Sequence, residues 1–182
     1  MRTRLSIVAL ALAGLVGCAT NQAPDVAGKI RDSLKQAGLN GVTVAQNRDK
    51  GVVTLGGNVS QDADKARAGQ IAQPLAAGQV VANEIAVLPD KNDTAAKTVN
   101  SDLDRGIQDN LDAALTQAQI DGVHHVTKNG VVTLTGTLPT PALRAQAEQI
   151  ADGVPNVAQV VNEIDVKNQR ATTSSSADRT RQ

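Results

Sequence analysis

The stretch GVVTLGG, residues 51–57, decides the fold of this chain, because nearly the same phrase, GVVTLTG, recurs at residues 130–136. When residues 51–87 are laid on residues 130–166 without gaps, 17 of 37 positions are identical. Self-similarity at a fixed spacing is the signature of a duplicated structural unit. The sequence therefore predicts two copies of one small domain.

Each copy of the phrase predicts a half-buried strand, because apolar residues alternate along residues 53–59 and 132–138. A helix with one apolar stripe should follow. Ser60 is the expected N-cap of this helix in the first copy, and Thr140-Pro141 is the expected start in the second. Residues 81–87 and 160–166 alternate again and predict a further strand.

Another helix and a short strand precede each phrase. The first helix should end before Gly38. In the second copy Ser101 is the expected N-cap, and the residues of the buried face are Leu103, Ile107, Leu111 and Leu115. Asn129-Gly130 is typical of a type I′ hairpin. The predicted fold class is therefore α+β: two tandem α-β-β-α-β domains, each a three-stranded sheet with two helices on one face.

The domain organisation follows from the same patterns. Changes in composition predict a signal peptide at 1–17, a tether at 18–24, domains at 25–88 and 99–166, a linker at 89–98, and a disordered tail at 167–182. Asp93 offers an alternative, since it could cap an earlier start of the next helix.

The N-terminus predicts export and lipid attachment. A basic start precedes an apolar run, residues 5–16, which is too short to span a bilayer and is typical of a signal peptide. The run ends in LVGC, residues 15–18, which resembles the bacterial lipobox. That resemblance implies acylation of Cys18, the single cysteine of the chain, and Ala19 then favours the outer membrane, facing the periplasm.

Composition excludes several classes of protein. The chain has 18 basic and 18 acidic residues, so removal of Arg2 and Arg4 with the leader leaves the mature part with a net charge of about −2. This net charge excludes the strongly basic surface of a nucleic-acid-binding protein. It has no Phe, Trp or Tyr, so Val, Ile, Leu and Ala must form the core. A single cysteine excludes an intramolecular disulfide.

The α-β-β-α-β unit with GVVTLxG and then VxNEIxV resembles the BON domain family over about residues 25–166. Two such units behind a lipobox resemble the dual-BON envelope lipoproteins. The resemblance implies a non-catalytic protein that binds membrane phospholipid or envelope proteins and supports envelope integrity. The alternative is a periplasmic regulator of, or an enzyme in, cell-wall or lipid metabolism.

The residues that could carry chemistry favour structural roles. His124 and His125 are adjacent on a strand and point to opposite faces, so they cannot easily share a metal ion. Asn83 and Asn162 fall on the apolar side of their strands and should tie down a neighbouring loop or strand end. Glu84 and Glu163 should lie on a solvated face. We expect no catalytic residues, no metal and no cofactor.

Membrane contact has two candidate sources besides the acyl chain. The resemblance implies that the first helix of the second domain faces the lipid. Residues 101–115, however, carry four aspartates and one arginine, which disfavours binding of this helix to an anionic membrane surface. The remaining candidates for contact with anionic phospholipid or a partner lie in the tail: Lys167, Arg170, Arg179 and Arg181. A merely solubilising tail is the alternative.

Overall fold

The computed structural model describes residues 22–89 and 94–167. Cys18 and the tail arginines Arg170, Arg179 and Arg181 lie outside these ranges. The first domain consists of α1 (Ala27–Gln36), β1 (Val42–Asn47), β2 (Val52–Val59), α2 (Asp62–Ala72), the 3₁₀ turn η1 (Gln73–Leu75), β3 (Val80–Asn83) and β4 (Ala86–Val87). The second consists of α3 (Thr94–Gln117), β5 (Val123–Lys128), β6 (Val131–Leu138), α4 (Pro141–Asp152), β7 (Gln159–Asn162) and β8 (Asp165–Val166).

Both domains have the predicted α-β-β-α-β order, and their sheets follow the same path. In the first domain β2 is central, with β1 antiparallel on one side and β3 parallel on the other. The strand predicted at 81–87 is interrupted at Glu84 and Ile85, but β4 resumes pairing with β2 in the same register. The second domain repeats this arrangement with β5, β6, β7 and β8.

Gly57 and Gly136 mark the place where the central strand of each domain meets another backbone closely. Gly57 has φ +89°, and a Cβ there would lie 2.1 Å from the carbonyl oxygen of Gly41. Gly136 has φ +124° and a Cβ would meet Gly122 at the same distance. A side chain at either position would therefore collide with main chain that cannot move aside.

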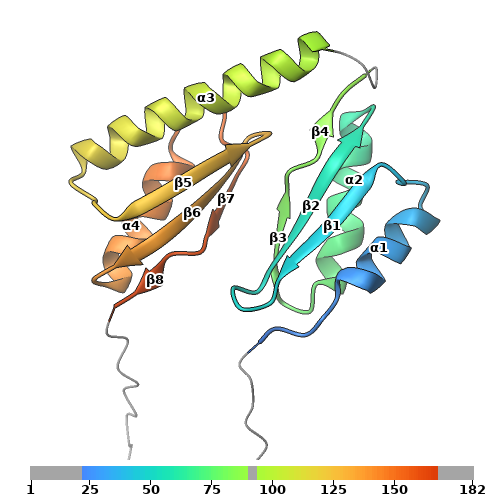
Figure 1. Ribbon diagram of the computed structural model, residues 1–182, viewed down its shortest axis with the longest axis horizontal. Helices are drawn as coiled ribbons and strands as arrows, with labels where there is room; N and C mark the ends of the chain where they lie inside the picture. Colours follow the sequence, from blue (N-terminus) through green and yellow to red (C-terminus); the bar gives the residue numbers. More distant parts are fainter. Residues whose placement is uncertain (1–21, 90–93, 168–182) are drawn as a thin grey trace, which may run out of the picture.

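One apolar core lies between the sheet and the helices of each domain. In the first, Ile30 and Leu34 of α1 and Ala68 and Ala72 of α2 pack on Leu55 and the other inward residues of the strands. The second core is built from the corresponding elements around Ile107, Leu111 and Leu134. The helices therefore cover one face of each sheet, and the other faces turn toward each other (Figure 1).

Helix starts differ from the sequence expectations. Thr140 is the N-cap of α4, and its hydroxyl accepts a hydrogen bond from Leu143 N at 3.2 Å. Ser60 is not a cap, since α2 starts after Gln61 and has no side-chain cap bond. Ser101 lies inside α3 because this helix already begins at Thr94, within the segment 89–98 predicted as a linker.

The longer α3 changes the environment of Leu103. The predicted buried face holds for Ile107, Leu111 and Leu115, but Leu103 is 47% exposed. The helix extends past its own sheet toward the first domain (Figure 1), so its N-terminal half has no sheet beneath it. The periodicity that predicted burial is therefore correct for the last three positions of the stripe and wrong for Leu103.

Candidate functional site: the junction between the two domains

The outer faces of the two sheets meet in a small apolar contact. Its four buried residues are Val52, Ala82, Val131 and Val161. Val52 and Val131 are equivalent in the repeat, and so are Ala82 and Val161. The contact is therefore formed by the same two positions of each copy, as in an interface with twofold symmetry.

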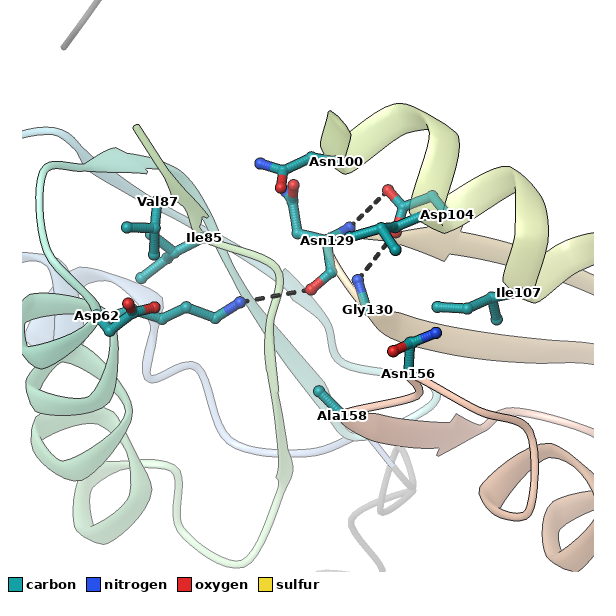
Figure 2. A pocket seen from close by; sticks show the side chains of 12 residues that line it. Asp62, Ile85, Val87, Asn100, Asp104, Ile107, Asn129, Gly130, Asn156 and Ala158 are labelled. Atoms are coloured by element: carbon teal, nitrogen blue, oxygen red, sulfur yellow. Dashed lines mark hydrogen bonds between the residues drawn. The ribbon is translucent and has the colours of Figure 1, made fainter. Parts of the chain in front are cut away.

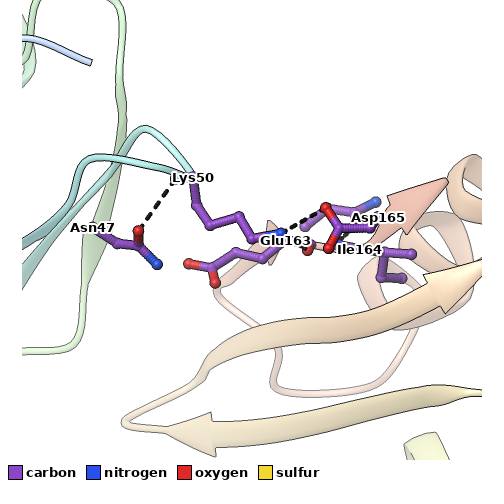
Figure 3. A network of polar contacts seen from close by, with 6 residues as sticks. Asn47, Lys50, Glu163, Ile164 and Asp165 are labelled. Atoms are coloured by element: carbon purple, nitrogen blue, oxygen red, sulfur yellow. Dashed lines mark hydrogen bonds and ion pairs between the residues drawn. The ribbon is translucent and has the colours of Figure 1, made fainter. Parts of the chain in front are cut away.

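Polar contacts around this cluster follow the same symmetry. Lys50, in the β1–β2 hairpin, donates from Nζ to the carbonyl of Glu163 at 3.3 Å and pairs with Asp165 at 2.6 Å. Figure 3 shows this side chain reaching across to the second domain. Asn129, the equivalent residue in the β5–β6 hairpin, donates from Nδ2 to the carbonyl of Glu84 at 2.8 Å. The interruption of each third strand thus presents a carbonyl to the other domain.

The prediction that Glu84 lies on a solvated face is wrong. Its side chain is 16% exposed and pairs with Lys128 of the second domain at 3.3 Å. The strand alternation correctly placed Glu84 on the face away from the helices. That face is the one that meets the other domain, which the sequence of one domain cannot reveal.

Gln159 completes the junction by occupying the edge of β3. Its Nε2 donates to Val81 O at 2.7 Å, and its Oε1 accepts from Asn83 N at 3.1 Å. An amide side chain thus pairs with the edge as a neighbouring strand would. The equivalent residue in the first domain is Val80, which cannot do this, so the twofold symmetry is incomplete.

A pocket of about 300 Å³ opens at this junction, between α2, the β3–β4 segment, α3 and the β5–β6 hairpin (Figure 2). Both domains contribute to its wall. Its lining residues are Asp62, Lys65, Ile85, Val87, Asn100, Leu103, Asp104, Ile107, Asn129, Gly130, Asn156 and Ala158. It therefore combines charged groups, amides and an apolar side.

Lys65 is the basic group of the pocket. Its Nζ donates to Asn129 O at 3.4 Å, a long hydrogen bond between the domains. Burial lowers the pKa of Lys65 from its ordinary value, and the negative charges of Asp62 and Asp104 partly oppose this effect. The ammonium group is thus half removed from water without a close ion-pair partner among the described residues.

Asp104 fixes the opposite wall. Its two carboxylate oxygens accept hydrogen bonds from Asn129 N at 2.8 Å and Gly130 N at 2.9 Å. Both turn residues have positive φ, as the predicted type I′ hairpin requires. The carboxylate therefore joins α3 to the hairpin that forms part of the pocket.

The predicted amides have structural roles, as expected, although their partners are helices. Asn83 Nδ2 donates to Lys65 O at 2.9 Å. Asn162 Nδ2 donates to the equivalent Arg144 O at 3.3 Å and to Glu148 at 2.9 Å. Each amide thus fastens the third strand to the second helix of its own domain.

The two histidines lie on opposite sides of β5. His124 is exposed, whereas His125 packs toward α3 and its Nε2 lies 2.8 Å from Asp112. The sequence predicts this arrangement of one exposed and one packed histidine. Within residues 22–89 and 94–167, no cluster of three or more His, Cys, Asp or Glu could hold a metal ion.

The N-terminal half of α3 forms a second candidate surface. No side chain from Thr94 to Gly106 is buried, and Val99 and Leu103 are 56% and 47% exposed. These two residues are spaced i, i+4 and so lie on one face of the helix. In the part of the chain that the structure describes, no helix has the length and apolar character needed to cross a membrane.

The fold and this junction define a tandem α+β protein whose two repeated domains share an interface and a polar pocket. The BON domain model matches residues 22–89 and 101–168, so the chain belongs to the BON domain family. No curated protein matches it.

Two solved structures are similar at low identity. One is CdsD, the structural protein of the type III secretion system of Chlamydia trachomatis, in its C-terminal domain. It shares 14% identity, with 78% of this chain and 97% of that chain covered and a TM-score of 0.33. A second CdsD structure shares 15% identity, with 76% and 90% covered and a TM-score of 0.36.

Proposed function

We propose that this protein is a non-catalytic envelope lipoprotein, held at the outer membrane by acylated Cys18 and facing the periplasm, that binds a protein partner through the N-terminal half of α3. The observation that carries the proposal is the exposed apolar pair Val99 and Leu103 on a helical segment without a buried side chain. A helical segment of this length is marginal in water by itself. Contact with a partner would bury the apolar pair and stabilise the segment.

The position of α3 supports a protein rather than the anchoring membrane as its partner. The described ends of the chain, Gln22 and Lys167, lie at one end of the molecule and α3 at the other (Figure 1). From Cys18 to Gln22 the chain can span at most about 14 Å. The acyl anchor would therefore hold the end opposite α3 close to the membrane.

Charge along the whole of α3 favours a partner with basic groups. In the N-terminal half, Asp102 and Asp104 balance Lys97 and Arg105, and the negative excess comes from Asp109 and Asp112 further along the helix. A partner with an apolar patch for Val99 and Leu103, and with Lys or Arg beside it toward the C-terminal half, would complement this helix. The alternative role, regulation of cell-wall or lipid metabolism, would use the same contact with an enzyme as the partner.

Two variants test the proposal in cells that lack the wild-type protein. Cys18→Ala should release the protein from the membrane fraction. Val99→Asp with Leu103→Asp should abolish support of envelope integrity, measured as detergent sensitivity, while Val126→Asp on the exposed face of β5 should not. Full function of the α3 double variant, at wild-type abundance, would refute the docking surface.

The basic tail residues Lys167, Arg170, Arg179 and Arg181 remain a predicted contact with anionic phospholipid. A non-acylated chain truncated after Asn168 should then lose salt-sensitive binding to anionic vesicles that the longer chain shows. If neither form binds, the acyl chain is the membrane contact and the tail is a solubilising segment.

A further inference from the structure

The interdomain pocket has a mixed set of polar groups with few internal partners. Lys65 makes one long hydrogen bond there. The side chains of Asp62, Asn100 and Asn156 form no hydrogen bond with the rest of the described chain. These groups offer both donors and acceptors toward the pocket (Figure 2).

The charges of the pocket disfavour a charged ligand of either sign. Lys65 repels a cation, and Asp62 with Asp104 repels an anion. Asp104 already accepts two main-chain hydrogen bonds, which leaves Asp62 and Lys65 as the groups with free capacity. A neutral ligand that both donates and accepts hydrogen bonds is complementary to this arrangement.

We infer that this pocket binds a neutral polyhydroxylated ligand of the size of a sugar ring. Adjacent hydroxyl groups can donate to Asp62 while accepting from Lys65, and the amides of Asn100 and Asn156 can do either. The exposed side of Leu103, with Val87 and Ala158, provides an apolar wall for the C–H face of the ring. A volume of about 300 Å³ lies at the small end of ligand pockets and suits one ring.

A peptide strand is a weaker fit, although peptides are also neutral donors and acceptors. A bound strand would need the main-chain edge of β3, and Gln159 already pairs with Val81 and Asn83 along that edge. The inference does not rest on the proposed function, because it requires only the pocket and no protein partner. Leu103 belongs to both sites, since it lines the pocket and is also half exposed on the proposed docking surface. Without an aromatic side chain to stack on the ring, we expect a dissociation constant of about 1–30 mM.

The test is an amide NMR titration of the mature chain with Cys18→Ser, using three sugars that differ in charge. Methyl glucoside should shift the amides of Leu103, Asn129 and Gly130 in a saturable way. Glucosamine, a cation, and glucuronate, an anion, should bind about threefold to fivefold more weakly, as expected for one partly exposed charge.

Variants of the two charged residues should reverse this selectivity. Lys65→Met should make glucosamine the preferred ligand, and Asp62→Asn should improve glucuronate relative to methyl glucoside. Lys29→Met, on the exposed side of α1, is the matched control and should change nothing. If Lys65→Met does not fold, Asp62→Asn decides alone.

Three results would overturn the inference. The first is that methyl glucoside causes no amide shifts up to about 100 mM, which is well above the expected dissociation constant. The second is that the three sugars bind with equal affinity. The third is that a capped neutral dipeptide shifts the same amides and binds more tightly than methyl glucoside.

Discussion

Lys50 and Asn129 occupy equivalent positions in the two domains, and each donates a hydrogen bond to the carbonyl of the equivalent glutamate in the other domain, at 3.3 and 2.8 Å. With the four apolar residues beside them, they make the junction resemble that of a homodimer in one chain. Because the domains share this surface, they should move as one body.

Val161→Asp should separate the domains without unfolding them. Val161 is 2% exposed in the interdomain cluster, and a carboxylate there would be buried without a partner. Nitrogen relaxation should report one rotational correlation time for the wild type and two shorter ones for the variant. Val126→Asp, at a position 66% exposed, is the control. A single unchanged correlation time in Val161→Asp would show that this cluster does not hold the junction.

Gly57→Ala should destabilise the first domain by at least about 1–3 kcal/mol, because the new Cβ would collide with Gly41 O and the residue would keep a strained positive φ. Urea unfolding measures this change. Gly28→Ala is the contrast: no atom lies within 4 Å of its Cβ position in α1, so stability should rise by up to about 1 kcal/mol. Equal midpoints for the two variants would contradict the close approach at Gly57.

Thr140→Ala should cost about 1 kcal/mol of unfolding free energy, because it removes the cap bond to Leu143 N. Ser60→Ala, one residue before the equivalent position in the first domain, should cost little, since the N-cap of α2 is Gln61. Thermal unfolding of the two variants side by side distinguishes them. A larger loss for Ser60→Ala would mean that α2 begins earlier in solution.

Lys65 should make stability depend on alkaline pH. Its pKa is lowered in the folded state, so the unfolded chain binds the proton more tightly and stability rises as pH increases from the lowered value toward 10.5. Relative to Lys65→Met, the wild type should therefore gain unfolding free energy across this window. Lys29→Met serves as the control for general alkaline effects. A difference between wild type and Lys65→Met that stays constant with pH would contradict the burial of this ammonium group.

The repeat predicted the fold of each domain because it displays the same periodicities twice. The glycines at 57 and 136, the hairpin at 129–130 and the amides at 83 and 162 all have the roles that their positions indicate. Each of these features depends on contacts within one domain, which the local pattern determines.

Because each domain is small and has no aromatic residue, the sequence predicts that the two domains pack on each other through an apolar patch, and the structure confirms this contact. The residues around this contact could not be predicted from patterns within one domain. The strand pattern predicts that Glu84 faces solvent, but the sheet of the other domain covers it. The helix pattern predicts that Leu103 is buried, but α3 extends past its own sheet and leaves it half exposed. The pocket combines residues from separate segments of both copies. One signal was present in the sequence: apolar Val52, Ala82, Val131 and Val161 lie on the strand faces away from the helices, at equivalent positions.

The central claim, that α3 binds an envelope protein with its exposed apolar face, is tested most directly by site-specific photocrosslinking in cells. A photoreactive residue at Val99 or Leu103 should give the same protein adduct, one at Ser101 on the opposite face should not, and Asp102→Lys with Asp109→Lys should reduce the yield. Phospholipid adducts at Val99 and Leu103, or equal protein adducts at Ser101, would contradict the account.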